Sequence, residues 1–263
     1  MRLACFRERR FGEMRALLQG FIVAFSMYSK IPMPRVQWTE TNMKYCFCFF
    51  PLIGAVIGLA QNLWFHLAVY AGFGVNFRTA VLILIPVAVT GGIHLDGLLD
   101  TADALSSYKT MEEKLEILKD SHAGAFAIIA GFSYFILAFG VFSEVTDSQL
   151  ILIGLGYVMS RSLSGLGLVT LKKAKNTGLL RTFSDAAANR KVSAVMAAYL
   201  AAASVAAVVL DPSGGFIMVI LAILVFIWYR GMAYHKFGGI TGDLAGCFLQ
   251  VCELVIAMGV ILV

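Results

Sequence analysis

The chain has 263 residues, of which 59% are hydrophobic and only 14% are charged, and its formal net charge is +5. A soluble domain is roughly half apolar and about a quarter charged, so this composition indicates a membrane protein. A small positive charge is typical of a chain anchored beside anionic lipid. We therefore expect the lipid bilayer as a partner and no nucleic acid.

Long apolar runs without alternation predict transmembrane helices, because a helix of about 20 apolar residues spans the hydrocarbon layer. A shorter apolar stretch at 17–32 is interrupted by Pro32 and Pro34 and has basic residues on both sides, which predicts an interfacial or re-entrant helix. We expect an all-α, polytopic membrane protein with about seven transmembrane helices in one domain, 1–263. The seven runs are 46–70, 79–95, 123–142, 150–170, 192–210, 215–230 and 245–263.

The distribution of charge predicts the orientation, since loops rich in Lys and Arg stay on the cytoplasmic side. The segment 171–191 carries six Lys and Arg residues against one acid, Asp185. The connections 143–149 and 211–215 contain acids and no Lys or Arg, which suits the outer side. Counting helices from the basic segment then places three further segments in the cytoplasm: 1–45, 96–122 and 231–244.

An acidic cluster follows the second apolar run, in the sequence GGIHLDGLLDTADAL at 91–105. Asp96, Asp100 and Asp103 are spaced four and three residues apart, so they share one helix face within an arc of about 60°. Neighbouring carboxylates repel one another and favour a cation among them. Mg²⁺ is usually held by one or two carboxylates together with water and substrate phosphates, so we predict a magnesium site and phosphate chemistry. Helix capping by solvated aspartates is the less favoured alternative.

A second polar cluster lies in GGITGDLAGCFLQVCE, at 238–253. Thr241 and Asp243 stand among glycines, and Gln250 and Glu253 follow on one face of the next helix. Glu253 lies within an apolar run, where an ionisable residue marks either a functional site or a hydrogen bond that fixes helix packing. Both readings stay open.

Three further features could complete a pocket. Arg161 falls in the middle of the run 150–170, where a guanidinium needs either a phosphate or a partner such as one of the aspartates. The sequence KLEILKDSHAGAFA brings Lys119, Asp120 and His122 to the start of a helix, whose free N–H groups favour a phosphate. The basic segment 171–191 could act as a lid, although solvated charge beside lipid also explains it.

The motifs GGIHLDGLLDTADAL, LEILKDSHAGAFA and GGITGDLAG resemble the cobalamin synthase family, also called adenosylcobinamide-GDP ribazoletransferases. The resemblance extends from YSKIPMP and FPLIGAVIG near the start of the chain to TGDLAG near its end, in the same order and spacing. The chain departs from the family pattern at His122, where a basic residue is common, and at Ala104, where a glycine is common.

This resemblance implies the last assembly step of the cobalamin nucleotide loop, at the inner membrane of a prokaryote. Adenosylcobinamide-GDP and α-ribazole, or its 5′-phosphate, would give adenosylcobalamin, or its 5′-phosphate, and GMP, with Mg²⁺ as cofactor. Asp96, Asp100 and Asp103 would be catalytic and metal-binding residues, with Asp103 the preferred general base. The candidate substrate-binding residues are His94, Lys119, Asp120, His122, Arg161, Asp243, Gln250 and Glu253, although His94 points away from the acidic helix face.

Two alternative functions remain. A different membrane phosphoalcohol transferase would also use clustered aspartates and magnesium, but the Ala-Arg pair expected after its Asp-Gly pair is missing from DGLLDTAD. A cation-coupled transporter would distribute its acids through the depth of the bilayer, whereas most acids here gather at one edge. Whether the chain forms a homo-oligomer stays open.

Overall fold

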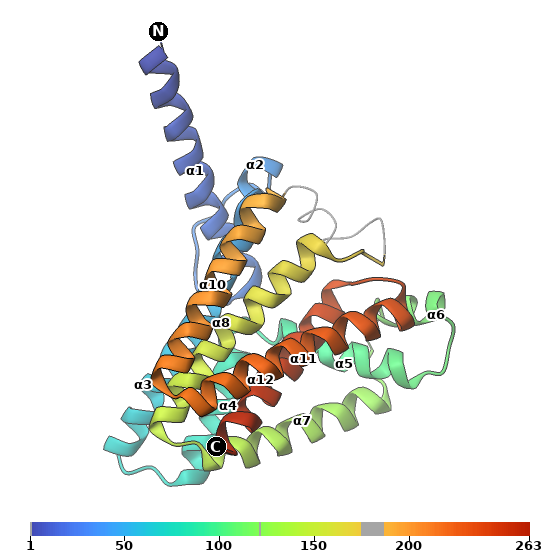
Figure 1. The fold of residues 1–263 in the computed structure, drawn as a ribbon. Coiled ribbons are helices and arrows are strands. Elements are labelled where there is room, and N and C mark those ends of the chain that lie inside the picture. Colours follow the sequence, from blue (N-terminus) through green and yellow to red (C-terminus); the bar gives the residue numbers. More distant parts are fainter. Residues whose placement is uncertain (1, 121, 175–186) are drawn as a thin grey trace.

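The computed structural model describes residues 2–120, 122–174 and 187–263, and this part of the chain is helical (Figure 1). Its only β-type pairing is a bridge between Lys173 and Ile240. The elements in chain order are α1 Arg2–Tyr28, α2 Glu40–Met43, the 3₁₀ helix η1 Cys46–Phe49, α3 Phe50–Tyr70, α4 Val75–Thr90, α5 Ile93–Ser106, α6 Met111–Ile117, α7 Ala125–Glu144, α8 Asp147–Thr170, α10 Asn189–Leu210, α11 Pro212–Phe237 and α12 Gly242–Ile261.

The transmembrane prediction is confirmed: among the described residues, six helical segments are long and apolar enough to cross a membrane, or seven if the bent pair α4 and α5 is one span. Helices α8 and α12 form the centre, because 67% of each apolar window is buried. The corresponding share is 28% in α7, 22% in α10 and 28% in α11. These outer helices expose large apolar side chains such as Phe132, Val209 and Ile227, as expected of an integral membrane protein.

The connections predicted to share the outer side lie together at one end of the bundle, near the C-terminus in Figure 1. His66 Nε2 of α3 lies 3.2 Å from Asp147 Oδ1 at the start of α8. Gln149 Nε2, one turn further on, donates to the carbonyl of Val260 near the end of α12, at 3.1 Å. Asp147 and Gln149 therefore join helices at this end of the bundle, away from the acidic cluster.

The predicted second span, 79–95, is wrong as a continuous helix. Helix α4 ends at Thr90, and α5 begins at Ile93 with its axis turned by 95°. Between them Gly91 and Gly92 have φ values of 67° and 80°, a left-handed conformation that glycine adopts without steric penalty. The two glycines therefore end α4 and change the direction of the chain, so that α5 crosses the bundle. There α5, which carries the acids, packs against α7 and α12.

The N-terminal helix is longer than predicted. The apolar stretch 17–32 predicts a short helix, whereas α1 runs from Arg2 to Tyr28 and projects beyond the bundle in Figure 1. It ends before Pro32, as the proline pattern predicts. Val23 and Ala24 are fully buried, so the second half of α1 is fixed on the bundle. Helix α1 is not among the candidate spans, and its interfacial position stays a prediction.

Helices α3 and α8 touch through glycines. A Cβ atom on Gly58 of α3 would lie 2.6 Å from the Cα atom of Gly154 on α8. A Cβ atom on Gly54, one turn earlier, would overlap the Tyr157 backbone. Small residues at a spacing of four allow this kind of close helix contact in membranes.

We predict that Gly58→Ala lowers the unfolding midpoint in detergent, because the added methyl group forces α3 and α8 apart at a cost of about 1–3 kcal/mol. The matched control is Gly140→Ala on α7, where a Cβ atom would meet nothing within 4 Å. That change should leave the midpoint unchanged or raise it, since alanine favours helix over glycine by up to about 1 kcal/mol. Equal effects of the two substitutions would contradict the close contact.

Candidate active site

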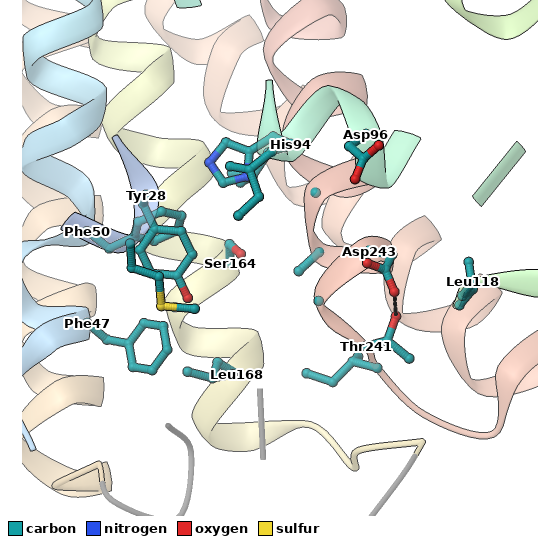
Figure 2. Close-up of a pocket in the computed structure, with 18 of the residues that line it drawn as sticks. Tyr28, Phe47, Phe50, His94, Asp96, Leu118, Ser164, Leu168, Thr241 and Asp243 are labelled. Carbon is teal, nitrogen blue, oxygen red and sulfur yellow. Dashed lines mark hydrogen bonds between the residues drawn. The ribbon is translucent and has the colours of Figure 1, made fainter. Parts of the chain in front are cut away.

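A cavity of about 320 Å³ opens where α1, α3, α5, α8 and α12 approach one another. Figure 2 shows that its lining is aromatic on one side and acidic on the other. We call Asp96, Thr241 and Asp243 the acidic wall. We call Tyr28, Phe47, Phe50 and His94 the aromatic wall.

The acidic wall joins the two clusters that the sequence places far apart. Asp96 lies in the first turn of α5 and Asp243 in the first turn of α12. The helices can meet there because a Cβ atom on Gly97 would lie 2.5 Å from the carbonyl oxygen of Asp243. Thr241 holds the start of α12, since its hydroxyl accepts from the Leu244 amide at 3.2 Å.

The acids on this side of the cavity form an electrostatic cluster. The negative charges of Asp96, Asp243, Asp103 and Asp120 all act on Asp100, which is half-buried on α5. In the described part of the chain, no three His, Cys, Asp or Glu side chains lie close enough to hold a metal ion by themselves. Two carboxylates that face a cavity nevertheless fit Mg²⁺, which completes its coordination with water and substrate phosphates.

Asp103 has a partner that the sequence pattern does not indicate. Its Oδ2 accepts from the Gly124 amide at 2.6 Å, and its Oδ1 accepts from the Ala127 amide at 2.9 Å. Both amides belong to the start of α7, so this carboxylate caps the helix and complements its dipole. Asp103 is not a lining residue of the cavity. Asp103 therefore occupies two of the amides at the start of α7, where the sequence analysis placed a phosphate.

Arg161 and Glu253 form a buried ion pair between α8 and α12. Arg161 Nη1 lies 2.6 Å from Glu253 Oε1, and the side chains are only 1% and 6% exposed. Ser160 also donates to Glu253 Oε1, at 2.9 Å. Of the alternatives left open for Arg161, the aspartate partner is not the one observed, because the acid that it meets is Glu253. The geometry favours the packing interpretation of Glu253. Gln250, on the same helix, is buried as well.

Residues 118–120 and 122 lie at the edge of the site. Lys119 lines the cavity, and its Nζ lies 2.6 Å from Glu116 Oε1. Asp120 and His122 are exposed and contact each other at 2.7 Å, outside the cavity lining. Hydrogen bonds from the His122 side chain and amide hold the pKa of Asp120 below its ordinary value. This pair is solvated, so it contributes little to stability.

The described start of the basic segment 171–191 is fixed beside the cavity. Ile240 N donates to Lys172 O at 2.9 Å, and Ala174 N donates back to Ile240 O at 3.0 Å. Lys173, between them, lines the cavity. Most of the predicted lid, 175–186, lies outside the described residues.

The sequence and its relatives identify the family. Residues 20–261 match the family described as cobalamin-5-phosphate synthase. The chain belongs to this family. No solved structure matches the chain.

Several curated relatives are named adenosylcobinamide-GDP ribazoletransferase. The protein of Lachnoclostridium phytofermentans is 46% identical over 93% of this chain and 94% of its own length. That of Clostridium botulinum strain Alaska E43 is 33% identical, covering 92% and 96% of the two chains. That of Desulfitobacterium hafniense is 31% identical, covering 90% and 94%.

The sequence pattern of this cobalamin-5-phosphate synthase family member did not indicate most of the aromatic wall. Tyr28, Phe47 and Phe50 were not candidate residues, whereas His94 was one. Tyr28 opens the motif YSKIPMP and Phe50 opens FPLIGAVIG, so the family-like segments near the start of the chain were the available signal. Ser164 of α8 is a further lining residue that the sequence analysis did not single out.

We predict that Asp103→Ala lowers the unfolding free energy in detergent by about 1–2 kcal/mol, because the α7 amides lose their cap. Gly124→Ala should act similarly, since its Cβ atom would lie 2.7 Å from Asp103 Oδ1. Asp96→Ala is the control, because Asp96 is exposed and should leave the unfolding free energy nearly unchanged. If Asp96→Ala destabilised the protein as much as Asp103→Ala, the capping role would be excluded.

We predict that Glu253→Gln destabilises the protein by about 3–5 kcal/mol, because it leaves the Arg161 guanidinium buried without a counter-charge. The double substitution Arg161→Met with Glu253→Met should recover most of this loss. Glu13→Gln breaks an exposed ion pair with Lys191 and should change the unfolding free energy by less than about 1 kcal/mol. Thermal unfolding in detergent measures all three, and an unchanged Glu253→Gln midpoint would refute the structural role.

Proposed function

We propose that this chain joins adenosylcobinamide-GDP to α-ribazole, or to α-ribazole 5′-phosphate, with release of GMP. The family supports the final step of cobalamin assembly, and the curated relatives carry the corresponding transferase name. The observation that carries the proposal is the cavity itself, in which an acidic wall and an aromatic wall face one another. One side suits a metal-bound diphosphate and the other suits an apolar ring.

We assign the magnesium ligands to Asp96 and Asp243. Asp100 lies one turn beyond Asp96 on α5 and is not assigned to the metal. This choice follows the cavity lining, which includes the first two carboxylates but not Asp103. Magnesium bound there would neutralise charge on the phosphate oxygens. Lys119 and Lys173 line the same cavity and add positive charge at its rim.

The proposed reaction is an in-line displacement at phosphorus. A ribose hydroxyl oxygen of the acceptor attacks the phosphorus next to the aminopropanol arm, forming a new phosphorus–oxygen bond. The bond from this phosphorus to the bridging oxygen breaks, and GMP leaves with that oxygen. Asp96 and Asp243 are assigned to the metal and Asp103 is engaged with α7, so Asp100 is the carboxylate of this cluster that accepts the hydroxyl proton. The protein contributes mainly positioning and charge neutralisation.

The acidic wall is proposed to face the cytoplasm. It lies away from the bundle end that contains the C-terminus and the connections 145–146 and 211. Those connections have no Lys or Arg, whereas the basic segment 171–191 begins beside the cavity. The positive-inside rule therefore supports this orientation.

We predict GMP release by the purified protein in detergent with lipid, and only when adenosylcobinamide-GDP, α-ribazole and Mg²⁺ are all present. EDTA should stop the reaction, and added Mg²⁺ should restore it. Asp96→Asn and Asp243→Asn should each lower kcat at least about 100-fold while leaving the unfolding midpoint near that of the wild type.

The controls separate chemistry from folding. Glu144 is the last residue of α7, at the opposite end of the helix from the Asp103 cap. Glu144→Gln should therefore keep wild-type turnover. Failure of folded wild-type protein to release GMP under these conditions would overturn the proposed function. Near-normal turnover in Asp96→Asn and Asp243→Asn would overturn the metal assignment alone.

A further inference from the structure

The aromatic wall brings together rings from four separate elements. Tyr28 comes from the end of α1, Phe47 from η1, Phe50 from α3 and His94 from α5. Phe47, Phe50 and His94 are 3%, 3% and 4% exposed, yet each borders the cavity. Figure 2 shows Tyr28, Phe47 and Phe50 on the side opposite Asp96 and Asp243, with His94 between the two groups.

The rings are arranged as a recess with faces and edges. The centroids of Tyr28 and His94 are 6.2 Å apart with their planes at 22°, and those of Tyr28 and Phe50 are 4.6 Å apart at 48°. Phe50 meets His94 edge-on at 5.9 Å and 70°. Such a surface favours a flat aromatic ligand, which can stack on one ring and meet the edge of another.

His94 supplies a polar atom that lacks a partner. Its Nε2 is buried and has no hydrogen-bond partner among the described residues. Buried polar atoms are almost always hydrogen-bonded in native proteins, so this exception, on a side chain that lines the cavity, points to a partner that enters from the cavity. This observation is independent of the aromatic lining. It indicates that the ligand carries one hydrogen-bonding atom on an otherwise apolar ring.

We propose that the aromatic wall binds the base of the acceptor nucleoside and that His94 Nε2–H donates to the base's ring nitrogen. This inference rests on the proposed function, in which the acceptor is α-ribazole. Its dimethylbenzimidazole base is flat and apolar, with one unsubstituted ring nitrogen as acceptor. His94, Asp96 and Asp243 line the same cavity, so a base held at His94 leaves its ribose in the space that the acidic wall also borders. A cavity of about 320 Å³ suits a nucleoside of this size.

The test compares two substitutions of His94. His94→Phe keeps a ring but removes the donor, and His94→Gln keeps an amide N–H near the position of Nε2. His94→Phe should raise KM for α-ribazole about tenfold or more and leave KM for adenosylcobinamide-GDP unchanged. His94→Gln should recover part of that loss. The matched control is His66→Phe, at the opposite end of α3, which should change neither KM.

Stability provides a readout that a merely structural role would not reproduce. His94→Phe removes a buried polar atom that has no partner, so its unfolding midpoint in detergent should equal or exceed that of the wild type. A histidine needed only for packing would instead lower the midpoint and change both KM values together. That second result would overturn the proposal.

Equilibrium binding of α-ribazole alone, followed by isothermal titration calorimetry, separates this inference from the proposed function. Binding that weakens in His94→Phe supports the inference even if no GMP is released by the wild-type protein. GMP release with an unchanged KM for α-ribazole in His94→Phe would overturn the inference and leave the function intact. Loss of a co-purified phospholipid from His94→Phe, without any change in α-ribazole binding, would identify a lipid site and also overturn it.

Discussion

Two helix backbones meet where Gly97 of α5 lies against Asp243 of α12, and the candidate site depends on this contact. A side chain on Gly97 would push the helices apart and separate the carboxylates of Asp96 and Asp243. The same crossing continues one turn further, where a Cβ atom on Gly246 would lie 3.0 Å from the carbonyl oxygen of His94. The glycines thus position the acids and the histidine together. The turn at Gly91 and Gly92 is what brings α5 to α12 at all.

The bilayer explains how charge is distributed in the bundle. Helices with little burial carry apolar side chains outward, and the charged pair of Arg161 and Glu253 lies between the two most buried helices. A buried charge in this setting requires a partner, and each of these residues supplies one for the other. The acids of the candidate site differ, because they surround a cavity that a cation and phosphates can enter. A charged residue that lines the cavity is therefore a candidate catalytic residue, whereas a charged residue paired between helices has a structural role.

Local patterns predicted the helices well, but they could not predict contacts between distant segments. Apolar runs located the spans, and the spacing of Asp96, Asp100 and Asp103 placed them correctly on one helix. The break after Thr90 was missed because the hydropathy continues across it, although the two glycines mark it. The partner of Asp103 lies 21 residues away in the sequence and is fixed only by the packing of α5 against α7. The aromatic wall was missed because aromatic residues are common in an apolar chain and their convergence is tertiary.

The cap that Asp103 places on α7 also closes a loop. The intervening residues, which include α6, leave α5 and return to α7 at a point fixed by one carboxylate. The entropy of closing such a loop changes slowly with its length, by about 0.6 kcal/mol for each doubling. Insertions near the exposed residues 108–110 should therefore be tolerated without moving α5 or α7. The length of this loop can diverge among related chains while the helices that build the cavity keep their positions.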